Sequence, residues 1–267
     1  MPLQSIVSAA VTGMVSHRLS VDVIANNLAN VNTIGYKTSR VTFHDMLYDR
    51  YRWATDNNDM RIGNGAKPAM IQRFHAQGGL VQTGRPTDFA VHGKGFFQVV
   101  LPDGTTAYTR SGAFQVAVDG RLVTPDGLEV TLLTPDGAPA AQPIPELLDN
   151  TETLRVDAEG RMFVLPEGRG EPLQLGQLQL AIFSNPEGLD AIGQSLFRGT
   201  IVAGPPAVGL PNTEGFGQIV QESLEAANVS IADEFSRLMT AQRAYTLSVR
   251  ALQTLDEMIG MANNLRR

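Results

Sequence analysis

A seven-residue repeat of apolar side chains near the C-terminal end constrains the fold of this chain more than any other feature. The members of the repeat and of its companion row are Leu224, Ile231, Leu238, Tyr245, Leu252, Ile259, Phe235 and Val249. This period is typical of a helix that packs along one seam against another helix. The pattern therefore predicts a helix over residues 223–265.

A second helix is predicted over residues 3–31, where apolar residues alternate in steps of four and three. Its stripe consists of Leu3, Val7, Ala10, Met14, His17, Val21, Ile24, Leu28 and Val31. Asn30, Asn32 and Gly35 follow, and they tolerate the left-handed backbone that ends a helix. The first helix runs towards the middle of the chain and the second runs away from it. If the two pack together, they must therefore be antiparallel.

Between the predicted helices, turn signals alternate with short β-prone runs. The turn signals are Pro102-Asp103-Gly104, Asp119-Gly120, Pro125-Asp126-Gly127, Pro135-Asp136-Gly137 and Glu159-Gly160. The runs cover residues 96–101, 122–124, 154–156, 161–165 and 178–183. Many short strands at such spacing indicate an antiparallel β body. The predicted fold class is α+β, in which two long terminal helices form an antiparallel, coiled-coil-like pair that flanks a mainly antiparallel all-β central body.

Three regions follow from these predictions. Residues 1–34 and 223–267 form a terminal helical assembly domain, and residues 79–198 form a β-rich outer domain. Residues 35–78 and 199–222 form an extended connector region, because 199–217 is rich in glycine and proline.

The N-terminal helix is almost free of charge. From residue 1 to residue 34 the charged side chains are Arg18 and Asp22, whereas a surface helix usually keeps a charged face towards water. Ala9 and Gly13 allow close backbone approach. These properties indicate a helix that is surrounded on several sides, as in a polymer. The alternative is an ordinary α+β domain in which both helices close over the β body.

We predict an assembly interface on the two helices. Its residues are Leu3, Val7, Ala10, Met14, Val21, Ile24, Asn26, Asn27, Leu28, Leu224, Ile231, Phe235, Leu238, Gln242, Tyr245, Val249, Leu252 and Ile259. Asn26 and Asn27 are expected to form hydrogen bonds between subunits and to fix their register, as a buried asparagine does in coiled coils. Asn30 and Asn32 are expected to end the helix.

Composition excludes several classes of protein. The chain has no cysteine, so it has neither disulfides nor thiolate metal sites. Its net charge of -6 gives no electrostatic reason to bind nucleic acid. No apolar run reaches the length of about 18 residues that membrane insertion requires. Because the first basic residue is Arg18, a secretory signal is not expected, and any export must use another route.

No catalytic, cofactor or metal site is predicted. His17, His44, His75 and His92 lack a second ligand at metal spacing. Asp56 and Asp59 indicate a solvated turn, and Gly93-Lys94-Gly95 lacks the frame of a phosphate-binding loop. The leading hypothesis is a polymerising structural subunit that is not an enzyme. Its rivals are a secreted β-rich enzyme and a monomeric adhesin or binding module.

Short motifs along almost the whole chain resemble the flagellar axial proteins, the subunits of the rod and hook. The N-terminal and central motifs occupy residues 26–33, 35–37, 79–80, 83–84, 88–91, 93–97 and 108–114. The C-terminal motifs occupy residues 183–189, 224–225, 228–229, 241–245 and 254–258. Within this family the length of the chain and the segment 185–189 are most similar to distal-rod members. Two departures, a short segment 48–61 and Ala227 in place of the usual serine, leave a proximal-rod or hook-type member as an alternative.

The resemblance implies further properties. A member of this family is a homo-oligomer that polymerises into a helical tube, transmits torque and encloses an export channel. Its partners are other rod and hook proteins and the bushing rings of the envelope. The resemblance also implies location in the basal body across the periplasm, and export through the flagellar type III apparatus without a cleaved signal.

Overall fold

The computed structural model describes residues 2–51, 60–134, 154–164 and 172–265 of the chain. The chain forms two compact units. The helical unit comprises Met1–Ala29, Ser39–Phe74 and Val229–Arg267, and the β unit comprises Asn30–Thr38 and His75–Asn228. These boundaries differ from the three regions expected from the sequence, because residues 39–74 belong with the helices.

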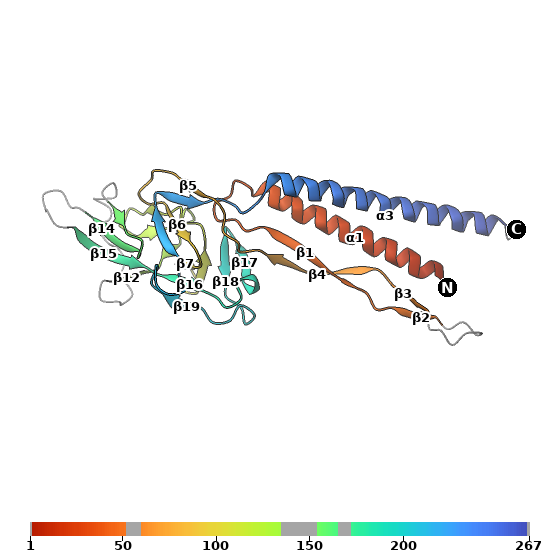
Figure 1. The fold of residues 1–267 in the computed structure, drawn as a ribbon, viewed down its shortest axis with the longest axis horizontal. Helices are drawn as coiled ribbons and strands as arrows, with labels where there is room; N and C mark the ends of the chain where they lie inside the picture. The colour runs from red at the N-terminus through yellow and green to blue at the C-terminus, as the bar shows by residue number, and fades with distance from the viewer. Residues whose placement is uncertain (1, 52–59, 135–153, 165–171, 266–267) are drawn as a thin grey trace. The chain divides into compact units, whose positions relative to one another are not determined.

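Two long antiparallel helices dominate the helical unit, α1 over Pro2–Ala29 and α3 over Ile231–Leu265 (Figure 1). The predicted antiparallel helix pair is therefore confirmed. Ser230 caps α3, because its Oγ accepts a hydrogen bond from the backbone N–H of Asp233 at 3.4 Å. Asp233 also places a carboxylate in the first turn, where the helix dipole favours negative charge.

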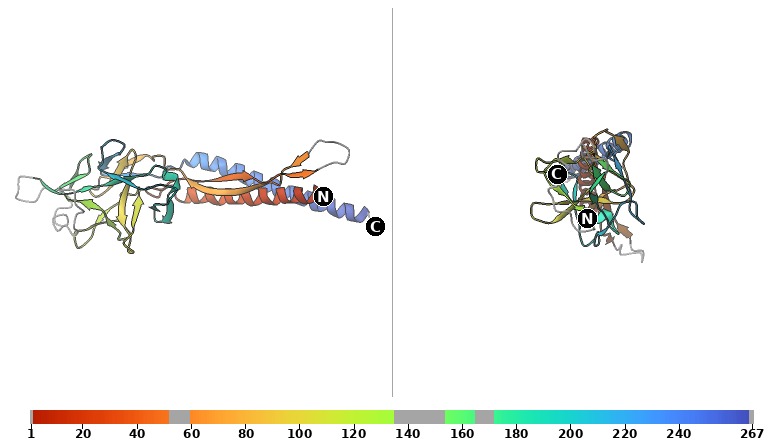
Figure 2. Two further views of the ribbon diagram at one scale, coloured as in Figure 1. Left: turned by 90° about the horizontal axis from the view of Figure 1, so that it is seen from below. Right: turned by 90° about the vertical axis from the view of Figure 1, so that its left-hand side faces the viewer.

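A β-hairpin that the sequence did not indicate lies along α1. Strands β1 (Ser39–Asp45) and β4 (Ala66–Arg73) pair antiparallel, with a register shift between Thr42 and Phe43. Two shorter paired strands, β2 (Asp49–Tyr51) and β3 (Met60–Ile62), extend the hairpin. The hydroxyl of Ser16 on α1 donates to the Ala66 carbonyl at 3.5 Å. Figure 1 and the left view of Figure 2 show the hairpin beside α1.

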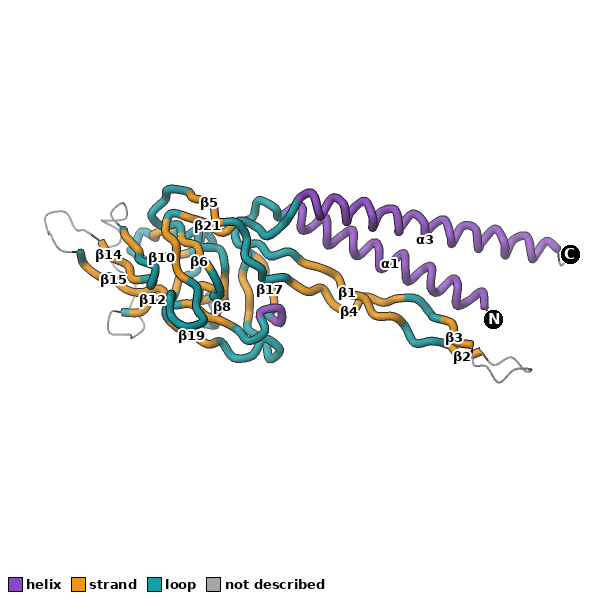
Figure 3. The backbone as a smooth tube through the Cα atoms, in the orientation of Figure 1, coloured by secondary structure: helices purple, strands orange, loops and turns teal. Residues whose placement is uncertain are grey.

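The β unit is built from short antiparallel strands, drawn in orange in Figure 3. They are β5 (Leu80–Gln82), β6 (Phe89–His92), β7 (Phe96–Val100), β8 (Thr106–Thr109), β9 (Gln115–Val116), β10 (Leu122–Val123), β11 (Glu129–Val130), β12 (Leu132–Leu133), β13 (Arg155–Val156), β14 (Arg161–Val164), β15 (Leu173–Leu178), β16 (Leu180–Ile182), β17 (Asp190–Gly193), β18 (Leu196–Arg198), β19 (Ala207–Gly209), β20 (Gln218–Gln221) and β21 (Ser223–Glu225). A 3₁₀ turn, η2, covers Pro186–Gly188.

The strands form several small sheets around a common core. The largest sheet has the order β17-β18-β8-β7-β11-β10-β9, and β16 joins it through β7 and carries β19. A second sheet has the order β12-β15-β14-β13, and the pairs β20–β6 and β21–β5 are separate. Phe97 and Phe114 are fully buried at the centre, with their ring centroids 5.2 Å apart. The antiparallel α+β architecture predicted from the sequence is thus confirmed.

Glycine supports the turns at which the sequence predicted them. Gly104 and Gly127 have φ values of 78° and 81°, which non-glycine residues rarely adopt. The predicted turn at Pro135-Asp136-Gly137 and the predicted loop with Asp56 and Asp59 lie outside the described residues.

The predicted start of the C-terminal helix is wrong. Residues 223–225 form β21, in which Leu224 pairs with Val81 of β5, and α3 begins only at Ile231. Leu224 is buried in the β unit, although it is in phase with the seven-residue repeat. The expected connector over 199–222 also contains the paired strands β19 and β20.

Candidate assembly interface

The helical unit has a small apolar interior. In the part of α1 and α3 that the structure describes, the buried apolar side chains are Val23, Ile24, Ala241 and Leu255. Gly13 faces α3, since a methyl group in place of its hydrogen would lie in ordinary contact, 3.7 Å from Ser248 Oγ. Helix pairs gain most of their stability from such packing. Among the described residues, this pair therefore buries few apolar side chains completely within one chain.

A buried polar junction joins both helices to the hairpin. Asn27 is fully buried, and its Nδ2 donates to the Ser39 carbonyl at 2.8 Å and to Glu234 Oε2 at 3.1 Å. Its Oδ1 accepts from the Ser39 N–H at 2.9 Å. Glu234 in turn accepts from Arg237 at 2.9 Å. Within one chain the Asn27 amide therefore positions α1, β1 and α3, and its expected role between subunits stays a prediction.

The structure divides the predicted interface residues into two groups. Those that are buried or partly buried in the helical unit are Val7, Ala10, Met14, Val21, Ile24, Asn27, Leu28, Leu238, Val249, Leu252 and Ile259. Those that are exposed are Asn26, Ile231, Phe235, Gln242 and Tyr245. Leu3 lies in α1, and Leu224 lies in the β unit. The first group serves packing within the chain, and an assembly role stays a prediction for both groups.

The helical unit also exposes apolar side chains that the sequence reasoning missed. On the helices these are Val11, Val15, Met239, Leu247, Met258 and Met261, and on β4 they are Met70 and Ile71. Leu247 is 64% exposed and Met261 is 59% exposed. Extended exposed apolar surface in a soluble protein marks an interaction site. A helical wheel drawn for the outer faces of both helices would have found the first six.

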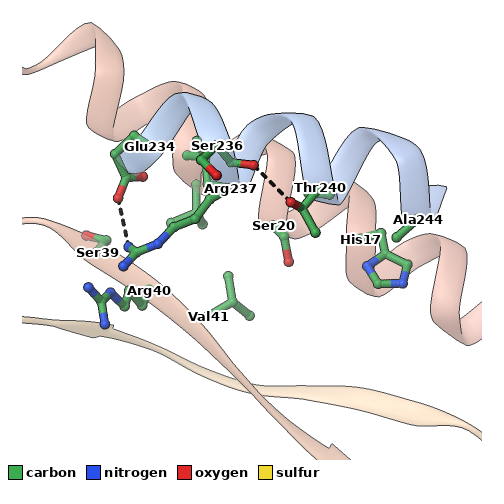
Figure 4. Close-up of a pocket in the computed structure, with 13 residues that line it drawn as sticks. His17, Ser20, Ser39, Arg40, Val41, Glu234, Ser236, Arg237, Thr240 and Ala244 are labelled. Carbon is green, nitrogen blue, oxygen red and sulfur yellow. Dashed lines mark hydrogen bonds and ion pairs between the residues drawn. The ribbon is translucent and has the colours of Figure 1, made fainter. Parts of the chain in front are cut away.

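A groove of about 470 Å³ opens between α1, β1 and the N-terminal half of α3 (Figure 4). Val23, Ile24 and Ala241 form its apolar part, and Arg40 and Arg237 add positive charge. The guanidinium of Arg40 lies 4.8 Å from the ring centre of Phe74. The groove combines an apolar floor with hydroxyls and guanidinium groups, which suits contact with another protein segment rather than catalysis.

A buried cluster of charges organises the β unit. Glu225 is fully buried and accepts from Lys37 Nζ at 2.6 Å, from the Gly78 N–H at 2.8 Å and from Arg110 Nη1 at 3.4 Å. Arg110 also donates to the Gly93 carbonyl at 2.9 Å. We call Lys37, Glu225 and Arg110 the charge cluster. It joins segments that are far apart in the sequence and lie within the resembling motifs.

Burial shifts the proton affinities in the charge cluster. Burial lowers the pKa of the Lys37 ammonium, and the Glu225 carboxylate opposes this shift. Burial also lowers the pKa of the Arg110 guanidinium, again against the effect of Glu225. Two cations share one carboxylate here, so Glu225 is the group on which the charge balance of the cluster depends.

The histidines give no sign of metal chemistry in the part of the chain that the structure describes. No group of three or more histidine, aspartate or glutamate side chains there could hold a metal ion. His75 packs between aromatic rings, with its ring centroid 5.0 Å from that of Phe197 and 5.4 Å from that of Phe96. His17 lines the groove. No helix among the described residues is long and apolar enough to cross a bilayer.

The chain combines antiparallel terminal helices, a β unit that lies between them in sequence and exposed apolar helix faces. Three family models match the chain. They are a flagella basal body rod protein over residues 8–37, the FlgE/F/G hook protein D1 domain over residues 90–164, and the FlgEFG basal body rod protein C-terminal region over residues 220–265.

Whole-length relatives narrow the assignment. The flagellar basal-body rod protein FlgG of Borreliella burgdorferi is 41% identical over 97% of this chain and 97% of its own length. FlgG of Caulobacter vibrioides is 36% identical over 96% of this chain and 97% of its own length. FlgG of Bacillus subtilis is 33% identical over 97% of this chain and 98% of its own length. The chain therefore belongs to the FlgG family of flagellar basal-body rod proteins.

Proposed function

We propose that this chain is a structural subunit of the distal rod of the bacterial flagellum. It polymerises with copies of itself into a helical tube that transmits torque and encloses the export channel. The observation that carries the proposal is the exposed apolar surface on both terminal helices, in a chain similar to rod proteins over its whole length.

The energetics favour assembly over a finished monomer. Each large apolar side chain that becomes fully buried contributes about 1.5–3 kcal/mol. Phe235, Met239, Leu247, Met258 and Met261 are each more than half exposed on α3 alone. Contacts with neighbouring subunits supply the stability that a single helix pair lacks. The helical unit should therefore gain most of its order on polymerisation.

The β unit has a different role in this proposal. Its core of buried aromatic and aliphatic residues is complete within one chain, so it folds before assembly. Lys37 and Glu225 of the charge cluster lie in the β unit, close in sequence to two of the four points where the chain passes between the units. The expected partners are other rod and hook proteins and the envelope rings, and the expected site is the basal body across the periplasm, reached through the flagellar type III apparatus.

Hydrogen exchange on dilute protein tests the proposal. We expect fast exchange in α1 and α3 and slow exchange in β6, β7 and β16. After polymerisation, both helices should become protected by at least a hundredfold. Equal protection of helices and strands in a stable monomer would contradict the proposal and favour a monomeric binding module. A proximal-rod or hook-type role would be favoured instead if the chain polymerised but failed to restore motility to a strain that lacks its own FlgG.

A further inference from the structure

An exposed seam runs along the C-terminal half of α3. We call Leu247, Ala251, Thr254, Met258 and Met261 the α3 outer seam. They follow each other in steps of four and three, and all are exposed. This is the spacing of a helix that receives a second helix, as on the side of α3 that packs on α1. The seam carries no charge.

A row of charges borders this seam at intervals of seven residues. Its members are Arg243, Arg250 and Glu257, and all are exposed. Charges that flank an apolar seam set partner choice and orientation in helix pairs. Of these three charges, the two nearest to the exposed methionines are Arg250, which is positive, and Glu257, which is negative.

The side of α1 that faces away from α3 has matching properties. We call Val11, Val15, Arg18, Asp22, Ala25 and Ala29 the α1 outer face. They also follow each other in steps of four and three, and all are exposed. Both charges of α1 lie on this face, between a pair of valines and a pair of alanines. A neighbouring helix would meet apolar surface at both ends and a cation and an anion in the middle.

We propose that the α1 outer face of one copy packs on the α3 outer seam of a second copy, in antiparallel orientation. This inference rests on the proposed function and specifies how subunits contact each other. Only the antiparallel orientation places Arg18 beside Glu257 and Asp22 beside Arg250. Among the described residues, none of these four side chains forms an ion pair within its own chain, so all are available for these contacts.

The charge pairing fixes a register that also matches side-chain sizes. Val15 then lies opposite Met258, which brings two apolar side chains together, and Ala25 lies opposite the larger Leu247. Within one chain Gly13 lies against Ser248, whereas in the proposed contact it faces Gly260 of the second copy. Compared with the pairing of α1 and α3 within one chain, the proposed pairing is shifted by about twelve residues, or about 18 Å along the helix at about 1.5 Å per residue.

The proposed contact joins two different surfaces of the chain. Such a heterologous contact repeats from copy to copy and produces an open helical polymer when the rotation does not close. A contact of one surface with itself would instead produce a closed dimer. The geometry therefore connects the two exposed helix faces with polymer growth.

Cysteine cross-linking tests the register directly, because the chain has no cysteine of its own. Val15→Cys and Met258→Cys are introduced into separate full-length proteins that carry tags of different mass. The proteins are mixed, polymerised and oxidised, so only a contact between copies can produce the mixed disulfide. We expect efficient formation of this cross-link, at least tenfold above that of the control pair Val15→Cys and Ala251→Cys, which is one heptad away. Both target positions are exposed, so the fold should tolerate the substitutions.

Charge reversal provides an independent test. Arg18→Glu and Glu257→Arg should each raise the critical concentration for polymerisation, about two- to fivefold for a partly exposed pair, and the double variant should restore it. Two results would overturn this interface and leave the proposed function in place. The first is normal polymers in which the control pair cross-links better. The second is normal polymers in which the double variant does not restore the critical concentration. A wild-type chain that never polymerises would overturn both.

Discussion

Replacement of Glu225 by glutamine should destabilise the β unit more than any other single isosteric change in it. The carboxylate is fully buried and is the acceptor for both Lys37 Nζ and Arg110 Nη1. Glutamine keeps the volume but removes the charge, which leaves two buried cations without a compensating anion. Removal of one partner from a buried ion pair costs about 3–5 kcal/mol in the free energy of unfolding.

Urea unfolding, followed by far-UV circular dichroism, measures this loss in the free energy of unfolding. For slopes of about 1–3 kcal/mol per molar urea, the midpoint should fall by about 1–5 M. The control is Asp119→Asn, which removes an exposed carboxylate beside Arg121 and should leave the midpoint almost unchanged. A loss below about 1 kcal/mol for Glu225→Gln would refute the view that this carboxylate balances the cluster.

Three further predictions follow from single residues. Asn27→Ala should lower the free energy of unfolding of the helical unit by about 2–3 kcal/mol, because it leaves buried partners unsatisfied, and hydrogen exchange in α1 and α3 would report the loss. Because the pKa of Lys37 is lowered in the folded protein, the unfolded chain binds more protons between that pKa and about 10.5, and the free energy of unfolding should rise with pH in this window. Lys37→Met should abolish this rise, which urea unfolding at a series of pH values measures. Gly112→Ala should prevent folding of the β unit, since a methyl group there would overlap the Phe89 carbonyl oxygen, whereas Gly127→Ala, with open space around it, should cost only about 1 kcal/mol; thermal melts compare the two.

Local patterns determined much of this fold. The 3.6-residue periodicity and the residues that end helices located α1 to within a few residues, because such signals act over short stretches of chain. Asp-Gly and Glu-Gly turns located β10, β13 and β14, since the left-handed backbone of the turn depends on the glycine itself. The motifs also led to the correct family.

Other features depend on contacts between segments that are distant in sequence. The repeat placed Leu224 on a helix, yet pairing with Val81 more than 140 residues earlier draws it into a strand. The residues of β1 and β4 show no strict alternation of apolar and polar side chains, so the hairpin is recognised only from its strand pairing and its contact with α1. The sequence did not indicate that the Asn27 amide forms hydrogen bonds with Ser39 and Glu234 within the chain.

The sequence by itself determined which helices form, that the middle of the chain is antiparallel β structure, and that the first helix carries only Arg18 and Asp22 as charges. Only the tertiary structure decided which faces of α1 and α3 are used inside one chain and which remain exposed. The reason is physical. A heptad pattern shows that a helix has an apolar seam, but which seam is covered depends on what the rest of the chain brings against it.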